Sequence, residues 1–350
     1  MNKPVFNRED FTLCDVPVPK GYPQSQTHSG VALYNGTFFL TASPYPAKRY
    51  KRKVALLRIV LNKISLGILC KPLIGEFFEN PCLYVGMKDA HDKSGIPVHF
   101  IPMMKNPLMD TPEKYNNLPA FNSDPDIFIE DGVVYILNRS VYRTKMLEIG
   151  YESITKIYLI SGDIEGNKFR LSENHLIKEW NKPYASPCLT KYHGEYIFMY
   201  LDTNSALDAE TFNGIYVQRT KILSDLAHTA KSEKIRVNCG QLLPWHMSVF
   251  QYSDTMYSII ACVIKGDKTK KIWQMLGIFN RDLSELTILP RPLTDYNSYR
   301  GSACVNDDGL FILYSTTVME HIPGSKAVDG RDVIMASMPF KKLLCNARNV

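Results

Sequence analysis

Three acidic side chains in this sequence border runs of residues that favour β-strands. Asp124 opens the segment SDPDIFIEDGVVYIL, Glu79 lies in FFENP, and Asp202 follows EYIFMYL. A carboxyl group can accept or donate a proton during bond cleavage, and two that face each other can act as acid and base. Asp124, Asp202 and Glu79 are therefore the candidate catalytic residues.

A second set of side chains is suited to binding a polar substrate. Its histidines and arginines hold oxygen atoms, its one carboxylate accepts hydrogen bonds, and its aromatic rings offer flat surfaces to the C–H faces of a sugar. The candidate substrate-binding residues are His28, Tyr45, Asp126, Arg139, Trp245, His246, Tyr299 and Arg300. Taken individually, candidates of both sets also have structural explanations. Asp124 before Pro125 can cap a turn, and His28 and His246 can be core histidines.

One hairpin pattern positions these residues at five places in the chain. In the segment opened by Asp124, an alternating run is followed by the turn pair Asp131-Gly132 and a second run rich in β-branched and aromatic residues. This pattern predicts a β-hairpin. The same template fits when it starts at residues 28, 124, 186, 246 and 301, and the strands after its turns read TFFLTA, VVYILN, EYIFMY, TMYSII and LFILYS.

The repeat predicts an all-β fold, a five-bladed β-propeller of four-stranded antiparallel blades that spans residues 1–350 as a single domain. One blade cannot bury both faces of its sheet, so the blades must pack around an axis. Residues 47–122 hold an insertion or extra strands, residues 224–234 favour a short helix, and one terminus must close the ring. Because the first strand of each blade enters from one end, the five openings should gather at one axial mouth.

Composition limits the classes of partner. The formal net charge of +6 is modest, and its densest run, KRYKRK at residues 48–53, lacks interleaved aromatic residues. We favour a solvated loop over a site for an anionic polymer there, and we expect no nucleic acid partner. The N-terminus has no apolar stretch of the signal-peptide kind, and no segment is long and apolar enough to cross a bilayer. These features favour a protein that is cytoplasmic or phage-encoded, with no membrane partner.

Cofactor motifs are absent from the sequence. The eight cysteines include no C-x-x-C pair, which favours buried free thiols over a disulfide framework or a zinc site. Neither G-x-G-x-x-G nor a Walker loop occurs. We therefore expect no cofactor and no metal; a structural calcium on the axis cannot be argued from these residues.

The repeated openings resemble those of the five-bladed glycosidase superfamily, which includes glycoside hydrolase families 43, 32 and 130 and less characterised bacterial and phage relatives. The segments that carry the resemblance are HSG with NGTFFLTASPYP, SDPDIFIEDGVVYIL, ASPCLTKYHGEYIFMY, PWHMSVFQYSDTMYSII and YRGSACVNDDGLFILYS. It implies a carbohydrate-active enzyme that cleaves a glycosidic bond of an oligo- or polysaccharide in an axial funnel. SDP resembles the Asp-Pro opening of families 32 and 43, whose carboxylate stabilises the transition state or tunes the acid, and this implies such a role for Asp124.

The usual carboxylate pair is not preserved in place. The resemblance to family 43 puts the base at His28 and the acid near Ala185 or Ser186, where no carboxylate exists. Asp124 is then the principal proton-transferring group, unless Asp202 or Glu79 supplies the missing partner. The resemblance to family 130 implies phosphorolysis, with His28, His246, Arg139 and Arg300 holding phosphate or an anionic glycan. The alternative is a glycan-binding or virion structural propeller that has lost catalysis, and a third possibility is a protein-interaction propeller.

Overall fold

The structure is a computed structural model. It describes residues 2–20, 22, 24–45, 60, 64, 79–87, 95–103, 106–118, 120–146, 151–165, 168–203, 211–227, 231–269, 271–327 and 330–349. The basic run at 48–53 and most of the expected insertion at 47–122 therefore lie outside the described residues.

All five predicted hairpins are confirmed by antiparallel pairing of consecutive strands. Their strands are β2 (Gln26–Tyr34) with β3 (Thr37–Pro44), β6 (Ala120–Glu130) with β7 (Val133–Met146), β10 (Tyr184–Tyr192) with β11 (Glu195–Thr203), β14 (Leu242–Tyr252) with β15 (Thr255–Ile264), and β18 (Ser298–Val305) with β19 (Leu310–Thr317). At three of the turns, both central residues have a positive φ: Asn35-Gly36, Asp131-Gly132 and His193-Gly194. Such turns match the twist of the strands they join.

The strands form three four-stranded sheets and one eight-stranded sheet. The four-stranded sheets have the orders β2-β3-β4-β5, β6-β7-β8-β9 and β1-β20-β19-β18, and the eight-stranded sheet has the order β10-β11-β12-β13-β17-β16-β15-β14. The further strands are β1 (Thr12–Leu13), β4 (Cys82–Gly86), β5 (Phe100–Pro102), β8 (Tyr151–Glu165), β9 (Lys168–Trp180), β12 (Phe212–Thr220), β13 (Glu233–Asn238), β16 (Trp273–Phe279), β17 (Glu285–Pro292) and β20 (Val333–Pro339). The all-β prediction is confirmed, but the described strands do not divide into five separate sheets.

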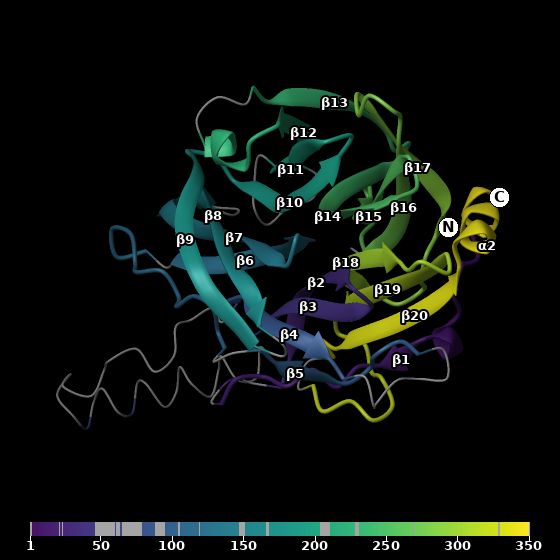
Figure 1. Cartoon of the computed structure of the whole chain (residues 1–350), viewed down its shortest axis with the longest axis horizontal. Coiled ribbons are helices and arrows are strands. Elements are labelled where there is room, and N and C mark those ends of the chain that lie inside the picture. Colours follow the sequence, from purple (N-terminus) through teal and green to yellow (C-terminus); the bar gives the residue numbers. More distant parts are fainter. Residues whose placement is uncertain are drawn as a thin grey trace.

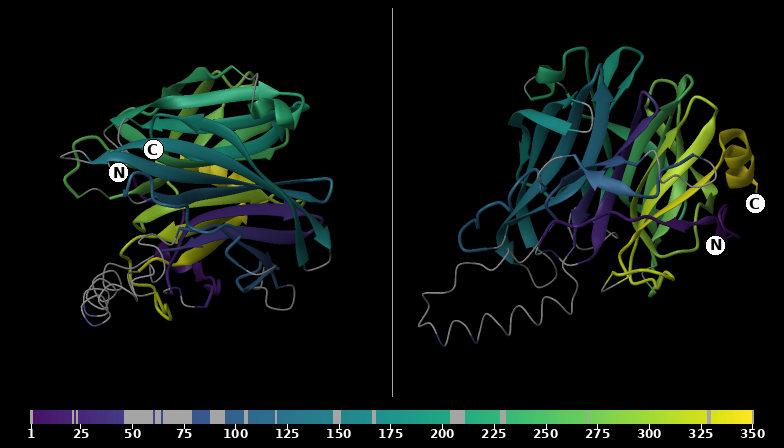
Figure 2. Two further views of the ribbon diagram at one scale, coloured as in Figure 1. Left: turned by 90° about the vertical axis from the view of Figure 1, so that its left-hand side faces the viewer. Right: turned by 60° about the horizontal axis from the view of Figure 1, so that its bottom comes forward.

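The first strands of the five hairpins surround one axis (Figure 1). Each contacts the next around the ring, in the order β2, β6, β10, β14, β18 and back to β2. In the four-stranded sheets the other strands lie progressively farther from this axis, whereas in the eight-stranded sheet β13 and β17 lie farthest out (Figure 1). The side views show the sheets packed face against face (Figure 2). Apolar residues such as Leu40, Ile136, Phe198, Ile260 and Phe311 fill the spaces between sheets and are almost fully buried. Their burial supplies the main driving force for this arrangement.

A β-bulge interrupts every one of these hairpins where its template begins. The pairing register shifts between Thr27 and Gly30, Ser123 and Asp126, Ala185 and Cys188, Pro244 and His246, and Ser298 and Gly301. A bulge bends its strand and turns a side chain away from the regular alternation. His28, Asp124 and Ser186 also have a left-handed backbone, with φ of 55°, 52° and 49°. The repeated openings are thus sites where side chains leave the sheet plane.

Segments near both ends of the chain belong to the sheet that contains β18 and β19. β20 pairs with β19, and the short N-terminal β1 completes the sheet by pairing with β20. The helix predicted at 224–234 is only partly present: a 3-10 helix, η3, spans Leu223–Ala227, whereas β13 begins at Glu233. A second 3-10 helix, η1 (Arg8–Asp10), and the C-terminal helix α2 (Phe340–Arg348) were not predicted. Among the described residues, no helix is long and apolar enough to cross a membrane.

Candidate functional site

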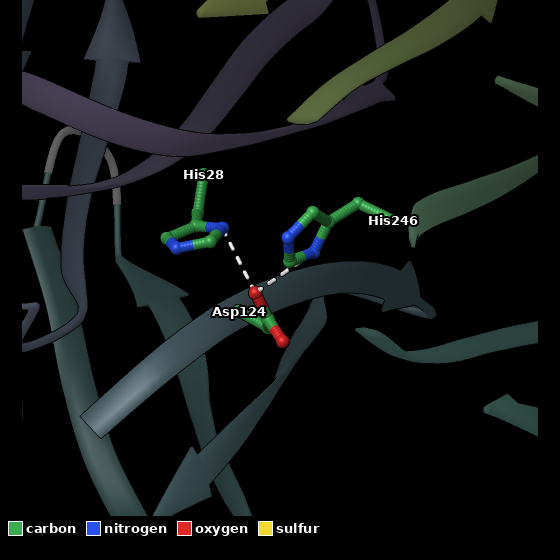
Figure 3. A group of neighbouring side chains, drawn as sticks. All are labelled: His28, Asp124 and His246. Carbon is green, nitrogen blue, oxygen red and sulfur yellow. Dashed lines mark ion pairs between the residues drawn. The ribbon is translucent and has the colours of Figure 1, made fainter. Parts of the chain in front are cut away.

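Side chains from three of the five openings meet at the carboxylate of Asp124 (Figure 3). The Nδ1 atom of His28 lies 2.9 Å from its Oδ1 atom, and the Nδ1 atom of His246 lies 3.3 Å from the same oxygen. The backbone N–H of Ser186 donates to Oδ2 at 3.0 Å. The predicted convergence of the openings on the axis is therefore present. We call the group formed by His28, Glu79, Ser123, Asp124, Arg139, Ser186 and His246 the axial cluster.

Asp124 is an ionised carboxylate with no exposed surface. Burial by itself favours its neutral form, but Arg139, whose Nε atom lies 3.0 Å from Oδ2, and the two histidines favour the anion more strongly. Together they hold the pKa of Asp124 well below its ordinary value. A carboxylate in this state stabilises nearby positive charge and is a poor proton donor.

His28 bridges two carboxylates. Its Nε2 atom lies 3.3 Å from Oε2 of Glu79, on the opposite side of the ring from Asp124. Burial lowers the pKa of His28, but the adjacent carboxylates outweigh it and raise the pKa overall. His28 and the hydroxyl of Ser123, which donates to Glu79 at 2.7 Å, in turn lower the pKa of Glu79. The two carboxylates beside buried His28 therefore favour its protonated, imidazolium form.

His246, in contrast, is a neutral imidazole at neutral pH. Its burial, combined with the positive charges of His28 and Arg139, lowers its pKa to about 4 despite the attraction of Asp124. Its Nδ1 atom lies 2.9 Å from the hydroxyl of Ser186. Within the described residues, its Nε2 atom is buried without a hydrogen-bond partner. The pKa values of two histidines that contact one carboxylate oxygen are thus shifted in opposite directions.

Arg300 and Asp126, both expected to bind substrate, pair with each other below the cluster. Nη2 of Arg300 lies 2.9 Å from Oδ1 of Asp126, and the guanidinium also donates to the carbonyl oxygens of Met247 at 3.1 Å and Pro125 at 2.6 Å. Arg300 is completely buried. These contacts join β6, β14 and β18 and leave no exposed atom of Arg300 for a ligand. Because of burial, the pKa of Asp126 rises to about 6 even with Arg300 beside it.

The remaining predicted residues lie beside the cluster or away from it. The ring of Tyr299 contacts both histidines, with centroids 5.0 Å from His28 and 4.4 Å from His246, and Trp245 lies 5.7 Å from Tyr299. The face of Tyr45 is covered by Arg331, whose guanidinium carbon lies 3.9 Å from the ring centroid. Asp202 instead accepts a hydrogen bond from Asn213 at 2.8 Å, on the second and third strands of its sheet.

His28, Asp124 and His246 offer donor atoms within 4.8 Å of one another, a spacing compatible with a metal ion. Two imidazoles and a carboxylate suit a transition metal. A metal ligand must, however, be an unprotonated imidazole, whereas the adjacent carboxylates favour protonated His28. The guanidinium of Arg139 beside Oδ2 also opposes a second cation. The cluster therefore fits a network of ion pairs better than a metal centre, and we assign no metal to it.

Two of the cavities lined by described residues lie near the ends of the five hairpins or beside the N-terminal segment. One, of about 680 Å³, opens at the hairpin turns, away from the bulges, and all five first strands contribute to it through residues such as Leu33, Ile129, Thr190, Gln251 and Val305. The other, of about 270 Å³, is lined by segments 13–18, 24–26 and 324–333 with His99. It includes Arg331, which connects it to the tyrosines beside the axial cluster.

Sequence reasoning missed three residues of this region. Ser123 and Ser186 sit at predicted openings, but a hydroxyl carries little signal without knowledge of its partner. Arg331 lies outside the hairpin template, so the repeat could not position it. The residue types at the openings were a usable signal, since Asp and His tolerate a left-handed backbone better than most residues do.

No protein-family model matches this sequence, and no curated protein is similar to it in sequence. Solved structures, in contrast, share its fold. A xylan β-1,4-xylosidase from Bacillus halodurans has a TM-score of 0.61 at 12% identity, covering 91% of this chain and 53% of that one, so the present chain spans about half its length. The β-xylosidase RS223 has a TM-score of 0.54 at 10% identity, covering 90% and 92%. A Penicillium chrysogenum α-L-arabinanase complexed with arabinobiose has a TM-score of 0.50 at 13% identity, covering 94% and 98%.

These xylosidases and arabinanases are five-bladed β-propeller glycoside hydrolases of family 43. The resemblance in fold that the sequence predicted is therefore confirmed. At 10% to 13% identity the comparison establishes the fold alone.

Proposed function

We propose that this chain is a carbohydrate-active protein that cleaves a glycosidic bond at the axial face carrying Asp124. The proposal depends mainly on one observation. His28, Ser186 and His246, from three different hairpins, converge on the carboxylate of Asp124, which comes from a fourth. Propeller enzymes that bind ligands on the axis use such convergence to bring distant residues together. The shared fold with xylosidases and arabinanases supports a sugar substrate.

In this proposal, Asp124 acts as a fixed negative charge. Glycosidic cleavage develops positive charge on the sugar ring, and a nearby carboxylate stabilises it. Glu79 is the second carboxylate of the cluster and retains some exposed surface, 7% against none for Asp124. Its lowered pKa suits a base or nucleophile, and the imidazolium of His28 beside it is the group able to return a proton. Asp202, one strand farther out and paired with Asn213, is the less favoured partner.

The second candidate is a glycan-binding or virion structural propeller without catalysis. The observation that favours it is the saturation of Asp124: Arg139, His28, His246 and the Ser186 N–H already surround its two oxygens. In addition, the resemblance to family 43 puts the base at His28 and the acid near Ala185 or Ser186, and none of these residues is a carboxylate. A buried, neutralised ion network of this kind can serve to fix the geometry of a binding face.

Phosphorolysis and binding of an anionic glycan by Arg139 and Arg300 are less favoured. Both guanidinium groups are buried and face carboxylates of the chain, Asp124 and Asp126 respectively. An anion at either position would have to displace an internal partner. If the substrate is anionic, its charge must be bound elsewhere.

We also propose that the chain forms one five-bladed domain. The eight-stranded sheet then consists of two blades, β10 to β13 and β14 to β17, joined by a short parallel pairing of β13 with β17. That pairing involves Arg236 with Glu285, Val237 with Leu286 and Asn238 with Thr287. The remaining contacts between the two halves lie in the core, as they do between the other sheets.

Incubation of the full chain with xylo-, arabino- and uronic-acid oligosaccharides, with and without inorganic phosphate, tests this proposal. Release of reducing ends supports hydrolysis, and release of sugar phosphates supports phosphorolysis. Retention of a glycan without release supports the non-catalytic candidate. If the protein neither retains nor cleaves any member of the panel, both functions are contradicted.

A further inference from the structure

Four aromatic rings gather where β9 ends and β10 begins. The ring centroid of Trp180 lies 4.7 Å from that of Tyr184 and 4.8 Å from that of Tyr200. Tyr216 in turn stacks on Tyr200, with centroids 5.5 Å apart. All except the buried Tyr200 are half-buried and keep exposed surface. We call these four residues the Trp180 platform, and the proposed function assigns it no role.

Hydrogen bonds fix the platform beside the axial cluster. In the short connection between β9 and β10, the carbonyl oxygen of Lys182 accepts a hydrogen bond from the hydroxyl of Thr155 at 2.7 Å. The carbonyl oxygen of Tyr184 accepts one from Nη1 of Arg139 at 2.8 Å. Arg139 is also the residue whose Nε atom lies 3.0 Å from the carboxylate of Asp124. One guanidinium therefore contacts both the backbone of the platform and the axial carboxylate, so a ligand on the platform would lie next to the cluster.

Asp202 lies on the same face of the sheet as the platform. It is the antiparallel partner of Tyr184 on the neighbouring strand, and directly opposed residues share a face. Its Oδ2 atom accepts a hydrogen bond from Asn213 at 2.8 Å, but Oδ1 is buried without a hydrogen-bond partner among the described residues. Most buried polar atoms in folded proteins have such a partner. A hydroxyl group supplied by a ligand would give Oδ1 the donor that it lacks.

This combination of groups suits a neutral sugar. The C–H face of a sugar ring packs on an aromatic ring, and its hydroxyl groups donate to a carboxylate. The negative charge of Asp202 would repel the carboxylate of an acidic sugar. Lys234, whose Nζ atom lies 3.4 Å from Oδ1 of Asn213, is exposed, so solvent and salt screen its charge. The platform therefore favours uncharged over acidic sugars.

We propose that the Trp180 platform binds a neutral sugar unit of the glycan that is cleaved at the axial cluster. Trp180 and Tyr184 contact the apolar face of this unit, and Asp202 accepts a hydrogen bond from one of its hydroxyl groups. The inference rests on the proposed function for the identity of the ligand as a sugar. It gives Asp202, which the sequence suggested as a catalytic residue, a role in binding instead.

Binding of trisaccharides to the full chain tests the platform separately from catalysis. The probes are xylotriose, arabinotriose and the acidic trigalacturonate, titrated by calorimetry, with the recovered sugar checked for cleavage. We expect at least one neutral trimer to bind more tightly than trigalacturonate. Trp180→Ala should weaken binding of that trimer about tenfold and Asp202→Asn about threefold, as expected from losing an aromatic contact and a charge-assisted hydrogen bond. Trp273→Ala, at a half-buried tryptophan of β16, is the matched control and should leave the affinity unchanged.

A second variant keeps the test informative if Trp180→Ala fails to fold. Trp180→Phe retains a ring against Tyr200 but removes the indole. The change in tryptophan fluorescence on binding of the neutral trimer should therefore be smaller in Trp180→Phe than in the unmodified chain, and unaltered in Trp273→Phe. An unchanged fluorescence response in Trp180→Phe, or unchanged affinity in folded Trp180→Ala, would overturn the proposal.

The outcomes separate this inference from the proposed function. Tighter binding of trigalacturonate than of both neutral trimers, or no binding of any trimer, would also overturn the inference. Binding of a neutral trimer that depends on Trp180, without cleavage of any oligosaccharide, would contradict only the hydrolytic function. Cleavage of neutral oligosaccharides with an unchanged kcat/KM in Trp180→Ala would contradict only the role of the platform.

Discussion

The imidazole of His28 lies between the carboxylates of Asp124 and Glu79, 2.9 Å from the first and 3.3 Å from the second. In family 43, which the sequence resembles, the equivalent opening carries the carboxylate base. Here a cation occupies that position and a carboxylate from outside the hairpin template faces it. The axial cluster therefore keeps carboxylates and positive charges in balance with a different distribution of residues.

Loss of the Asp124 charge should destabilise the fold. Asp124→Asn leaves Arg139 and protonated His28 buried without their shared anion, and breaking a buried ion pair in this way typically costs about 3–5 kcal/mol. The free energy of unfolding in urea measures this. Asp131→Asn, at an exposed turn position that Asn also tolerates, is the matched control and should change stability by less than about 0.5 kcal/mol. Equal stability of both variants would show that Asp124 is not the electrostatic centre of the cluster.

Arg300 should matter to stability rather than to ligand binding. Arg300→Met removes the buried partner of Asp126, and we expect a loss of about 3–5 kcal/mol in the free energy of unfolding. Arg236→Met is the control, since its 3.8 Å pair with Glu285 is mostly exposed and such pairs contribute about 0–1 kcal/mol. A normally stable Arg300→Met variant with reduced glycan affinity would return Arg300 to the substrate-binding role that the sequence suggested.

The pKa values of the two axial histidines should be shifted in opposite directions. The pKa of His28 is raised above its ordinary value by Asp124 and Glu79, whereas burial lowers that of His246 to about 4. At pH 5.5, nitrogen chemical shifts should therefore identify His28 as an imidazolium and His246 as a neutral imidazole, with assignments from His28→Gln and His246→Gln. Two neutral or two charged rings at that pH would contradict the charge distribution described here.

His246 should also make stability depend on pH. Its pKa is lower in the folded chain than the unfolded value of about 6.5, so the unfolded chain binds the extra proton between these values. The contribution of His246 to stability is then complete above pH 6.5 and declines as the pH falls toward 4, by an amount of about 3 kcal/mol in all. The stability difference between the unmodified chain and His246→Gln, measured by urea unfolding from pH 7 to pH 4.5, should shrink accordingly. A difference that grows on acidification would reverse the sign.

The sequence was most informative where local chemistry decides the structure. Turn pairs such as Asp131-Gly132, which have a positive φ at both positions in three of the five hairpins, indicated tight turns, and the equal spacing from opening to turn aligned the five hairpins on one axis. It was less informative about pairing within the cluster. Arg139 and Arg300 were interpreted as free cations because their partners, Asp124 and Asp126, come from another hairpin and only the bulges bring them together. Arg331 lies outside the repeat and left no periodic signal.

Glu79 should affect activity strongly if it is the second carboxylate of the reaction, since it is the slightly more accessible one, 7% exposed against none for Asp124. Glu79→Gln keeps the shape of the side chain and its contact with Ser123 but cannot transfer a proton. We expect glycan cleavage to fall about a hundredfold or more with substrate affinity retained. Glu165→Gln, an exposed change far along β8, should leave both unchanged. Equal turnover in Glu79→Gln would remove Glu79 from the mechanism.

Turnover of the oligosaccharide panel by the unmodified chain and by Asp124→Asn is the most direct test of the proposed function. Reducing ends released per folded molecule are compared, with circular dichroism confirming that the variant is folded under assay conditions and glycan retention measured in parallel. We expect a loss of at least about a hundredfold in turnover with retention preserved, because Asn cannot stabilise the positive charge that develops on the sugar ring. Unchanged turnover in folded Asp124→Asn would show that the carboxylate on which the hairpins converge takes no part in cleavage.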